Sequence, residues 1–217
     1  MTLIYPGGDD PPMITQKDAW ENLYRSQRRP WRGTVTTETP FPFEKGDRIL
    51  DIGCGNGKAS LALIGHGCGV IGIDVSETAV RTCNELYGEM MKAVCASAAS
   101  VPLEHGDADG AAMIHVLEHL DDDELKAAVN ELHRILRPGA KVFVRVFRND
   151  DMRSDKGERM DERTVIRGNG IRYRYFDEDD LRNAFSGFIV ISMERTEETT
   201  KFRERRSRIE AVFERTA

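Results

Sequence analysis

The chain has 217 residues, with 31 lysines and arginines against 37 aspartates and glutamates, and its net charge is −6. This length fits one compact domain, and the 40% of apolar residues suffice for a buried core. No apolar run approaches the roughly 20 residues that span a bilayer, so we expect no membrane segment. The acidic balance argues against a broadly basic nucleic-acid surface but leaves room for a local patch.

Residues 1–15 contain prolines and glycines but neither a basic start nor an apolar stretch. They predict a flexible leader without a secretion signal, and hence a cytoplasmic protein. Residues 16–217 are expected to form one domain. No Cys-x-x-Cys pair is present, so the cysteines are interpreted as buried reduced thiols rather than zinc ligands; they are Cys54, Cys68, Cys83 and Cys95.

Short apolar runs alternate with amphipathic stretches from residue 48 onward. The first predicted strand, 48–52, leads through a glycine turn into a helix that begins at Lys58. A second strand, 70–75, ends at Ser76, whose hydroxyl can cap a helix over 77–90. A third strand follows at 92–95. This alternation predicts a parallel sheet with helices on both faces.

The second half continues the pattern with a strand over 109–116 and a helix whose first turn, 121–124, is acidic. Pro138-Gly139 ends that helix, and a fifth strand is expected from 141 to 147. Residues 148–172 are charged and without period, which predicts a lid-like insertion or a disordered segment. A helix over 177–185 and strands over 188–193 and 207–214 complete the chain, although 207–214 also fits a helix. The predicted fold is α/β: a doubly wound, mostly parallel, seven-stranded sheet.

A glycine loop follows the first strand, with Gly53, Gly55 and Gly57 at every second position. Such a loop lets the backbone turn sharply and bring its N–H groups close to a ligand. It lies where open parallel sheets bind ligands, at the carboxyl ends of the strands. Lys58 takes the place of the third glycine of the dinucleotide fingerprint, so a phosphate-binding loop fits poorly. A glycine triplet alone is also compatible with a plain turn.

Two acidic residues accompany the loop. Asp74 closes the second strand, where a carboxylate can accept hydrogen bonds from both ribose hydroxyls. Asp51 stands among apolar neighbours, which is costly unless it has a partner such as an ammonium group. The loop and the two carboxylates therefore indicate a nucleoside cofactor.

The run 51–57 resembles motif I of the class I S-adenosylmethionine-dependent methyltransferases, and Asp74 resembles the acidic residue of their motif II. Residues 109–119 are similar to motif IV, and 136–140 to the turn before strand five. The resemblance implies a Rossmann-like fold, methyl transfer, S-adenosylmethionine as cofactor and no metal. Ser97 departs from the acidic residue that the family usually places near the adenine. The cofactor site that the family resemblance implies comprises Trp31, Asp51, Gly53, Cys54, Gly55, Gly57, Asp74, Val75, Ser97, Ala98, Ile114 and His115.

A narrower resemblance concerns the acceptor. Arg29-Pro30-Trp31, the run 53–58 and the run 172–176 resemble the tRNA wobble-uridine carboxymethyl methyltransferases. That likeness implies a modified uridine in tRNA as acceptor and a small zinc-binding activator protein as partner. Arginines 172, 174, 203, 205 and 206 are candidate phosphate contacts.

An aromatic segment keeps a second class open. Trp20, Tyr24 and Trp31 are equally similar to the spacing in small-molecule thiol and metalloid methyltransferases, whose aromatic segment closes over the cofactor. Residues 16–45 are accordingly interpreted as a cofactor-covering helical segment, and a small-molecule acceptor remains an alternative. An N-terminal helix that packs its aromatic side chains on the core fits the pattern as well.

Methyl transfer is an in-line displacement at a sulfonium, so alignment and exclusion of water come first and a base is optional. A carboxylate acceptor would need a cation, for which Arg145 and Arg148 are the candidates. A hydroxyl, amine or thiol acceptor would use His119 as base. A packed loop histidine and a surface salt bridge are the plainer interpretations of His119 and Arg145. A non-catalytic cofactor-binding subunit also stays open.

Overall fold

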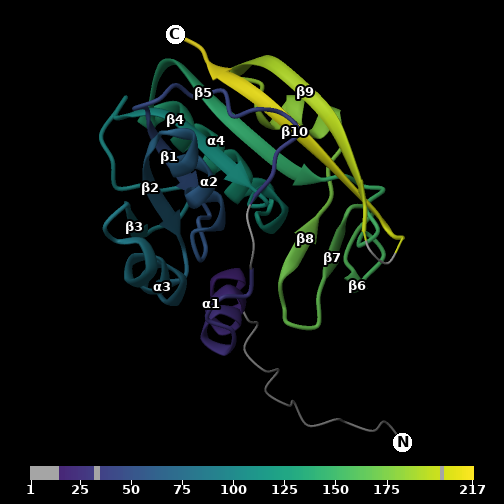
Figure 1. Ribbon diagram of the computed structural model, residues 1–217. Helices are drawn as coiled ribbons and strands as arrows, with labels where there is room; N and C mark the ends of the chain where they lie inside the picture. Colours follow the sequence, from purple (N-terminus) through teal and green to yellow (C-terminus); the bar gives the residue numbers. More distant parts are fainter. Residues whose placement is uncertain (1–14, 32–34, 201–202) are drawn as a thin grey trace, which may run out of the picture.

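The computed structural model describes residues 15–31, 35–200 and 203–217, so the predicted leader lies outside the described residues except for Thr15. A seven-stranded sheet in the order β3-β2-β1-β4-β5-β10-β9 forms its centre (Figure 1). Neighbouring strands among the first five are parallel, while β10 is antiparallel to both β5 and β9. The predicted doubly wound, mostly parallel sheet is confirmed, as is a strand at 207–214. The strands are β1 (Arg48–Ile52), β2 (Gly69–Asp74), β3 (Met91–Cys95), β4 (Ala108–Ile114), β5 (Leu136–Phe147), β9 (Phe188–Thr199) and β10 (Arg205–Arg215).

Helices cover both faces of the sheet because side chains alternate along each strand. In β1, Ile49 packs in one buried cluster with Leu63 of α2 and Cys83 of α3. Leu50 packs in another with Leu132 of α4. The helices are α1 (Gln16–Ser26), α2 (Lys58–His66), α3 (Glu77–Tyr87), α4 (Asp122–Ile135) and α5 (Glu178–Ala184), with a 3-10 turn η1 (Leu117–His119). No helix in the described ranges is long and apolar enough to cross a membrane.

Local capping sets where these helices begin. The Ser76 hydroxyl accepts a hydrogen bond from the backbone N–H of Ala79, as the sequence predicts for α3. Asp121 and Glu124 form a reciprocal capping box at the start of α4. These caps fix the two loops that carry the carboxyl ends of β2 and β4 into the helices.

Residues 148–172 differ from the expectation of a segment without regular structure. They contain β6 (Glu158–Arg159) and β7 (Thr164–Ile166), which join β8 (Arg172–Arg174) in a small antiparallel sheet beside the main one (Figure 1). Val165 and Ile171 are buried beneath it. The strands were missed because runs of two or three residues are too short to show an apolar period.

Two smaller expectations also need correction. Pairing between β4 and β5 begins at Leu136 rather than near Lys141, because Pro138-Gly139 is accommodated by a register shift in the ladder. Cys95 is exposed, whereas the other three cysteines are buried as expected. Its position at the end of β3, the edge strand of the sheet, explains the exposure.

Helix α1 is tied to both sides of the molecule. The Glu21 carboxylate accepts hydrogen bonds from Ser76 Oγ at 2.7 Å and from Thr78 Oγ1 at 2.5 Å, at the start of α3. Burial alone would raise the pKa of Glu21, but these hydrogen bonds lower it to about 2. On the other side, Gln16 Nε2 donates to the Gly170 carbonyl at 3.0 Å, and Arg172 N donates to Gln16 Oε1 at 2.8 Å. The helix therefore lies between α3 and the small sheet (Figure 1).

Candidate active site

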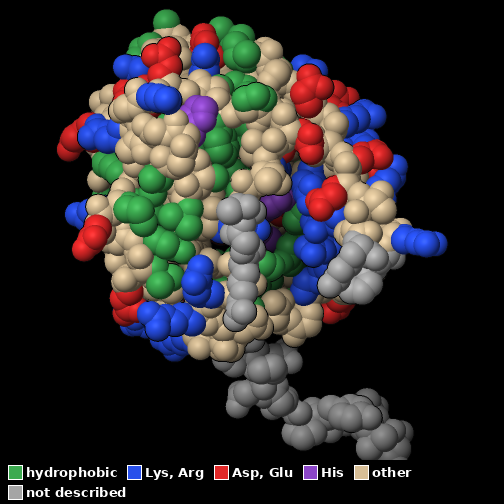
Figure 2. Space-filling view, viewed as in Figure 1, with side chains coloured by type: hydrophobic (Ala, Val, Ile, Leu, Met, Phe, Trp, Pro, Cys, Tyr) green, Lys and Arg blue, Asp and Glu red, His purple; other side chains and the backbone are tan. Residues whose placement is uncertain are grey.

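A cavity of about 580 Å³ opens at the carboxyl ends of β1, β2 and β4, with α1 forming one of its walls. Its volume is within the range of ligand pockets. Figure 2 looks into the hollow, where lysine and arginine side chains form a column along one wall. Most of the predicted cofactor residues line it: Trp31, Gly53, Cys54, Asp74, Val75, Ser97, Ala98, Ile114 and His115.

Asp74 is held rigidly at this cavity. Its Oδ2 accepts a hydrogen bond from Gly55 N at 2.8 Å, and its Oδ1 accepts one from Ser76 N at 2.9 Å. Burial nevertheless raises the pKa of Asp74 to about 6. The backbone N–H groups of Gly53 and Cys54 both turn back to the Ile73 carbonyl, at 2.7 and 3.0 Å. The glycine loop and the end of β2 thus form one hydrogen-bonded unit.

Gly55 and Gly57, which the resemblance assigns to the cofactor site, do not line the cavity. Both have positive φ angles, 53° and 80°. A Cβ at Gly55 would overlap the Tyr24 hydroxyl, and one at Gly57 would lie 2.9 Å from ring carbons of Tyr87. The loop needs these glycines for its turn and for the close packing of α1 and α3 against it.

Asp51 also lies behind the cavity wall rather than on it. Its side chain is 1% exposed and accepts a hydrogen bond from Ser60 Oγ at 2.5 Å. Burial raises the pKa of Asp51 to about 7. Its hydrogen-bond partner is a serine hydroxyl of α2, which nothing in the sequence pattern indicated.

The aromatic side chains that the sequence singled out, Trp20, Tyr24 and Trp31, all line the cavity. His119 lies beside them, with its ring 4.7 Å from that of Trp20 and 4.8 Å from that of Tyr173, both edge to face. Its Nδ1 lies 2.6 Å from the Arg172 carbonyl, and burial lowers its pKa. His119 is therefore a neutral, wedged side chain.

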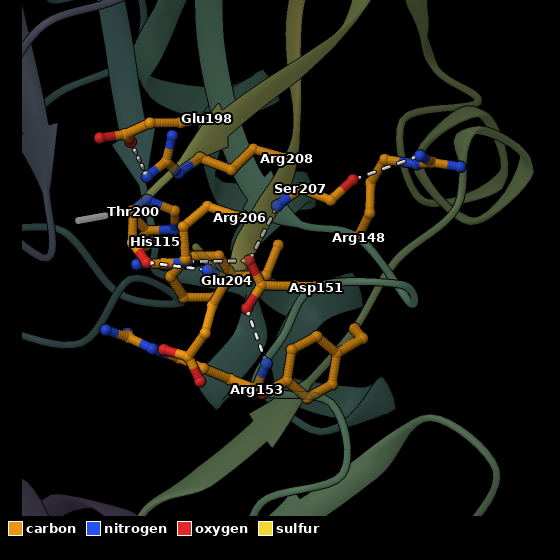
Figure 3. Close-up of polar contacts among 12 residues, drawn as sticks. His115, Arg148, Asp151, Arg153, Glu198, Thr200, Glu204, Arg206, Ser207 and Arg208 are labelled. Carbon is orange, nitrogen blue, oxygen red and sulfur yellow. Dashed lines mark hydrogen bonds and ion pairs between the residues drawn. The ribbon is translucent and has the colours of Figure 1, made fainter. Parts of the chain in front are cut away.

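The two predicted cationic residues have different surroundings. Arg145 lines the cavity, but its guanidinium forms an ion pair with the buried Glu210 carboxylate at 2.5 Å. Arg148 does not line the cavity: it binds Asp150 at 3.1 Å and Ser207 Oγ at 3.3 Å, and it points away from the arginines of the cavity wall (Figure 3). Arg148 is thus not part of the cavity lining.

Three other arginines, labelled in Figure 3, form the basic wall, and two of them lie over the Phe147 ring. Arg206 lies 4.7 Å from the ring centroid and binds the buried Asp151 carboxylate at 2.9 Å. Arg153 lies 5.8 Å from the same centroid and has no ion-pair partner among the described residues. Arg208 binds Glu198 at 2.9 Å. Sequence reasoning missed Arg153 because the segment after β5 has no period that fixes where its side chains point.

A histidine and glutamate pair completes the cavity floor. His115 Nδ1 lies 2.8 Å from Glu118 Oε1, and Phe147 N donates to the same oxygen at 3.0 Å. Burial raises the pKa of Glu118 to about 7 and, with the positive charge of Arg145 next, holds the pKa of His115 well below its ordinary value. The sequence predicted His115 as a cavity residue but not its pairing with Glu118.

The candidate phosphate contacts outside the cavity are mostly neutralised. Arg172 lies 3.6 Å from Asp121 and Glu124, Arg174 pairs with Asp122, and Arg205 binds Asp150 at 2.9 Å. Arg203 is exposed at a positive φ of 61°. Arg29 donates to the Tyr87 hydroxyl at 3.2 Å. These contacts leave less free positive charge on the surface than the sequence suggests.

Residues 50–144 match the sequence model of a methyltransferase domain family. An O-methyltransferase (resE) of Aspergillus sclerotiorum is 34% identical over 105 residues, 46% of this chain and 39% of the relative. The tRNA N(3)-cytidine methyltransferase METTL2 of Xenopus tropicalis is 29% identical over 163 residues, 68% and 48% of the two chains. A tRNA (carboxymethyluridine(34)-5-O)-methyltransferase of Arabidopsis thaliana is 35% identical over 103 residues, which are 47% of this chain and 24% of the relative. The chain thus spans less than half the length of these curated relatives.

Solved structures share the fold. A methyltransferase from Methanosarcina mazei, described as SAM-dependent, superposes with a TM-score of 0.71 at 22% identity, over 82% of this chain and 98% of that one. A putative methyltransferase of Haloferax volcanii, solved in complex with the Trm112 methyltransferase activator, gives 0.66 at 16% identity, over 93% and 92%. With the strand order, these likenesses show that the chain has the fold of the class I S-adenosylmethionine-dependent methyltransferases, and residues 50–144 match a methyltransferase domain.

Proposed function

We propose that the chain transfers a methyl group from S-adenosylmethionine to a nucleoside of tRNA, a modified uridine. The observation that carries this proposal is that one continuous cavity holds two different ends. The glycine loop and Asp74 form one end, and the aromatic and basic wall with Phe147 and Arg153 forms the other. A nucleoside cofactor and a second reactant can therefore meet in one enclosed space.

At the first end we assign Asp74 to the ribose hydroxyls, and Ser97 and Ala98 to the adenine. Ile114 and His115 then border the methionine part. Asp51, a buried carboxylate directly behind the loop, contributes negative charge toward the cofactor's ammonium group from outside the contact layer. Tyr24 and Trp31 cover the bound cofactor and exclude water.

The reaction asks little covalent chemistry of the protein. Because an in-line displacement requires the acceptor atom, the methyl carbon and the sulfur to be aligned, positioning and exclusion of water supply most of the rate enhancement. The buried Phe147 ring stacks on His115 and holds it at the cavity. Arg153 and Arg206 flank that ring and stabilise negative charge on the acceptor.

Two of the relatives described above are named for tRNA methylation, and their matches cover 68% and 47% of this chain. These two likenesses favour a tRNA acceptor. Aromatic rings beside guanidinium groups are features that bind an extruded nucleotide, and the Arg153 guanidinium has no ion-pair partner among the described residues. We also propose a small zinc-binding activator as partner, which would supply positive surface that the acidic chain lacks. The likeness to the Haloferax volcanii protein of the Trm112 complex supports that partner.

The test supplies labelled S-adenosylmethionine with bulk tRNA or with a small-metabolite extract, each with and without an added activator. Label in tRNA that falls steeply with added salt is expected, because phosphate contacts release counterions. Arg153→Ala should lose most of this label. Arg182→Ala, which removes an exposed arginine of α5, should not. Label transferred only to metabolites would refute the tRNA acceptor.

A small-molecule acceptor is the second candidate. It is favoured by the likeness to the O-methyltransferase of Aspergillus sclerotiorum and by the ion pairing of the surface arginines. The metabolite arm of the same experiment detects it.

A further inference from the structure

His115 has a backbone conformation that few residues adopt. Its φ is 58°, in the left-handed region, and Arg203 is the only other non-glycine residue in the described part of the chain with a positive φ. Such strain persists where the surrounding structure enforces it, and it is concentrated at functional sites. Here it follows the last residue of β4 and turns the imidazole toward the cavity, where the side chain remains 27% exposed.

The imidazole is clamped on two sides. Its ring stacks on the Phe147 ring, with centroids 4.0 Å apart and 21° between the planes. Its Nδ1 lies 2.8 Å from Glu118 Oε1, and the Glu118 side chain is fully buried. The backbone N–H of Phe147 donates to the same oxygen, which fixes the carboxylate in turn. The ring therefore has one defined orientation.

This clamp determines the tautomer. Burial raises the pKa of Glu118 to about 7, so its carboxylate is ionised above that pH. An ionised carboxylate can only accept, so Nδ1 then carries the proton and Nε2 carries the lone pair. Nε2 has no hydrogen-bond partner among the described residues, and it is not among their buried unsatisfied atoms. It therefore faces the open space of the cavity as an acceptor.

Charged groups face His115 from every element packed around it: Glu118 of η1, Arg145 of β5, Arg153 after β5, and Arg206 and Arg208 of β10. Figure 3 shows His115 beside the β10 arginines. Burial together with these guanidinium groups keeps the pKa of His115 well below its ordinary value. The imidazole is consequently unprotonated at neutral pH, and the same guanidinium groups stabilise an oxyanion forming beside it.

We propose that His115 Nε2 is the general base of the methyl transfer and that Glu118 is its positioning residue. The inference rests on the proposed function and deepens it, because a base is useful only if the acceptor group carries a proton. The acceptor is then a hydroxyl or a ring N–H of the uridine, not a carboxylate that is already ionised.

The step balances as follows. The acceptor O–H or N–H bond breaks and its proton moves to Nε2, while the electron pair left on the acceptor forms the bond to the methyl carbon. The pair of the breaking carbon–sulfur bond stays on sulfur, which loses its positive charge. His115 then returns the proton to water.

His119, the base that the sequence suggested, is unsuited to this role. Its Nδ1 is engaged with the Arg172 carbonyl, and its ring is held between Trp20 and Tyr173. It joins α1 to the small sheet and so helps to close the cavity.

The first test measures methyl transfer to bulk tRNA by His115→Asn and Glu118→Gln, with His105→Asn as a matched control on an exposed loop. His115→Asn should lower kcat by about 10²- to 10⁴-fold. S-adenosylhomocysteine affinity should fall far less than kcat does. The acid limb of the wild-type kcat profile should disappear in His115→Asn and shift in Glu118→Gln. An unchanged kcat, or a loss explained by cofactor affinity alone, would overturn the proposal.

The second test separates this proposal from the tRNA assignment. Labelled tRNA is treated with mild alkali, which cleaves methyl esters but not methyl ethers or N-methyl groups. Label that resists alkali supports His115 as base, whereas label released by alkali places the methyl on a carboxylate and overturns it while leaving tRNA as acceptor.

A third readout needs no acceptor. ¹⁵N imidazole spectra of the S-adenosylhomocysteine complex should show His115 with a proton on Nδ1 and none on Nε2. The opposite tautomer would contradict the proposal even if tRNA proves not to be the acceptor.

Discussion

Two buried carboxylates near the glycine loop have different surroundings and should respond differently to substitution. Asp74 reaches the cavity and is held by two backbone N–H groups. Asp51 lies behind the wall, with the Ser60 hydroxyl as its hydrogen-bond partner. The first is placed to touch a ligand, whereas we propose that the second acts on it through the electric field.

Asp74→Ala should weaken S-adenosylhomocysteine binding by about 1 to 3 kcal/mol, because two ribose hydroxyls lose a charged acceptor. Burial raises the pKa of Asp74 to about 6, so wild-type affinity should also fall as the pH falls through 6 and the carboxylate is protonated. Calorimetric titration at several pH values measures both effects. Unchanged affinity in a folded Asp74→Ala protein would remove Asp74 from the cofactor site.

Asp51→Asn should stabilise the cofactor-free protein above neutral pH. Burial raises the pKa of Asp51 to about 7, so the folded chain binds more protons than the unfolded chain between its ordinary value and 7. Stability contributed by this group is therefore greatest at low pH and declines as the pH rises through that window. At pH above 7 the substitution should raise the free energy of unfolding by about 1 to 3 kcal/mol.

The increase in the free energy of unfolding of Asp51→Asn should vanish at the acid end of this pH window. Cofactor affinity should fall, because the negative charge behind the glycine loop is gone. Chemical denaturation at the two pH extremes provides the measurement. If Asp51→Asn lowers the free energy of unfolding equally at both pH values, burial of the ionised Asp51 carboxylate does not cost stability.

At the scale of elements, the glycine loop is the joint between β1, α1 and α3. Gly55 has no room for a side chain because the Tyr24 hydroxyl occupies the space that a Cβ would need. Gly55→Val should therefore displace Tyr24 from the cavity wall and abolish S-adenosylhomocysteine binding while unfolding stays cooperative. Gly65→Val of α2, where a Cβ meets nothing within 4 Å, is the matched control and should bind normally. Normal binding by Gly55→Val would make the loop a plain turn.

The small sheet is the second element with a testable property. We propose that residues 148–172 act as a lid, since the segment carries Arg153 into the cavity while 155–162 are largely exposed. Limited proteolysis should cut within 155–162, and S-adenosylhomocysteine with bulk tRNA should protect this region. If the two ligands together leave the cleavage unaltered, residues 148–172 form a fixed wall of the cavity and not a lid.

Elements marked by a long apolar repeat, or by a capping or turn residue at one end, could be predicted from the sequence. Elements and contacts that depend on pairing between distant parts of the chain could not. The glycine loop, the Ser76 cap and the acidic start of α4 are local signals, so β1 to β5 and their helices follow from them. The sequence instead made Arg145 a candidate cation for holding a carboxylate acceptor. Its partner Glu210 lies opposite it in the β5–β10 register, far away in the sequence. The contact between His115 and Glu118 is local, but only the strained turn at His115 makes it.

At the scale of the whole molecule, the strand order brings the glycine loop, the end of β2 and the end of β4 to one edge, and α1 closes the space above them. Antiparallel β10 then adds a basic wall to the same cavity. The glycine loop and Asp74 come from the first half of the chain, and the basic wall of Arg153, Arg206 and Arg208 comes from the second half. We propose that acceptor choice depends largely on residues beyond β5.

The central claim is that this cavity binds S-adenosylmethionine as the cofactor of a methyltransferase. Isothermal titration of the purified chain with S-adenosylmethionine, S-adenosylhomocysteine and NAD tests it most directly. We expect saturable binding of the first two at one site, weakened in Asp74→Ala and abolished in Gly55→Val, and no binding of NAD. Binding of NAD in their place, or binding of S-adenosylhomocysteine that both substitutions leave unchanged, would contradict it.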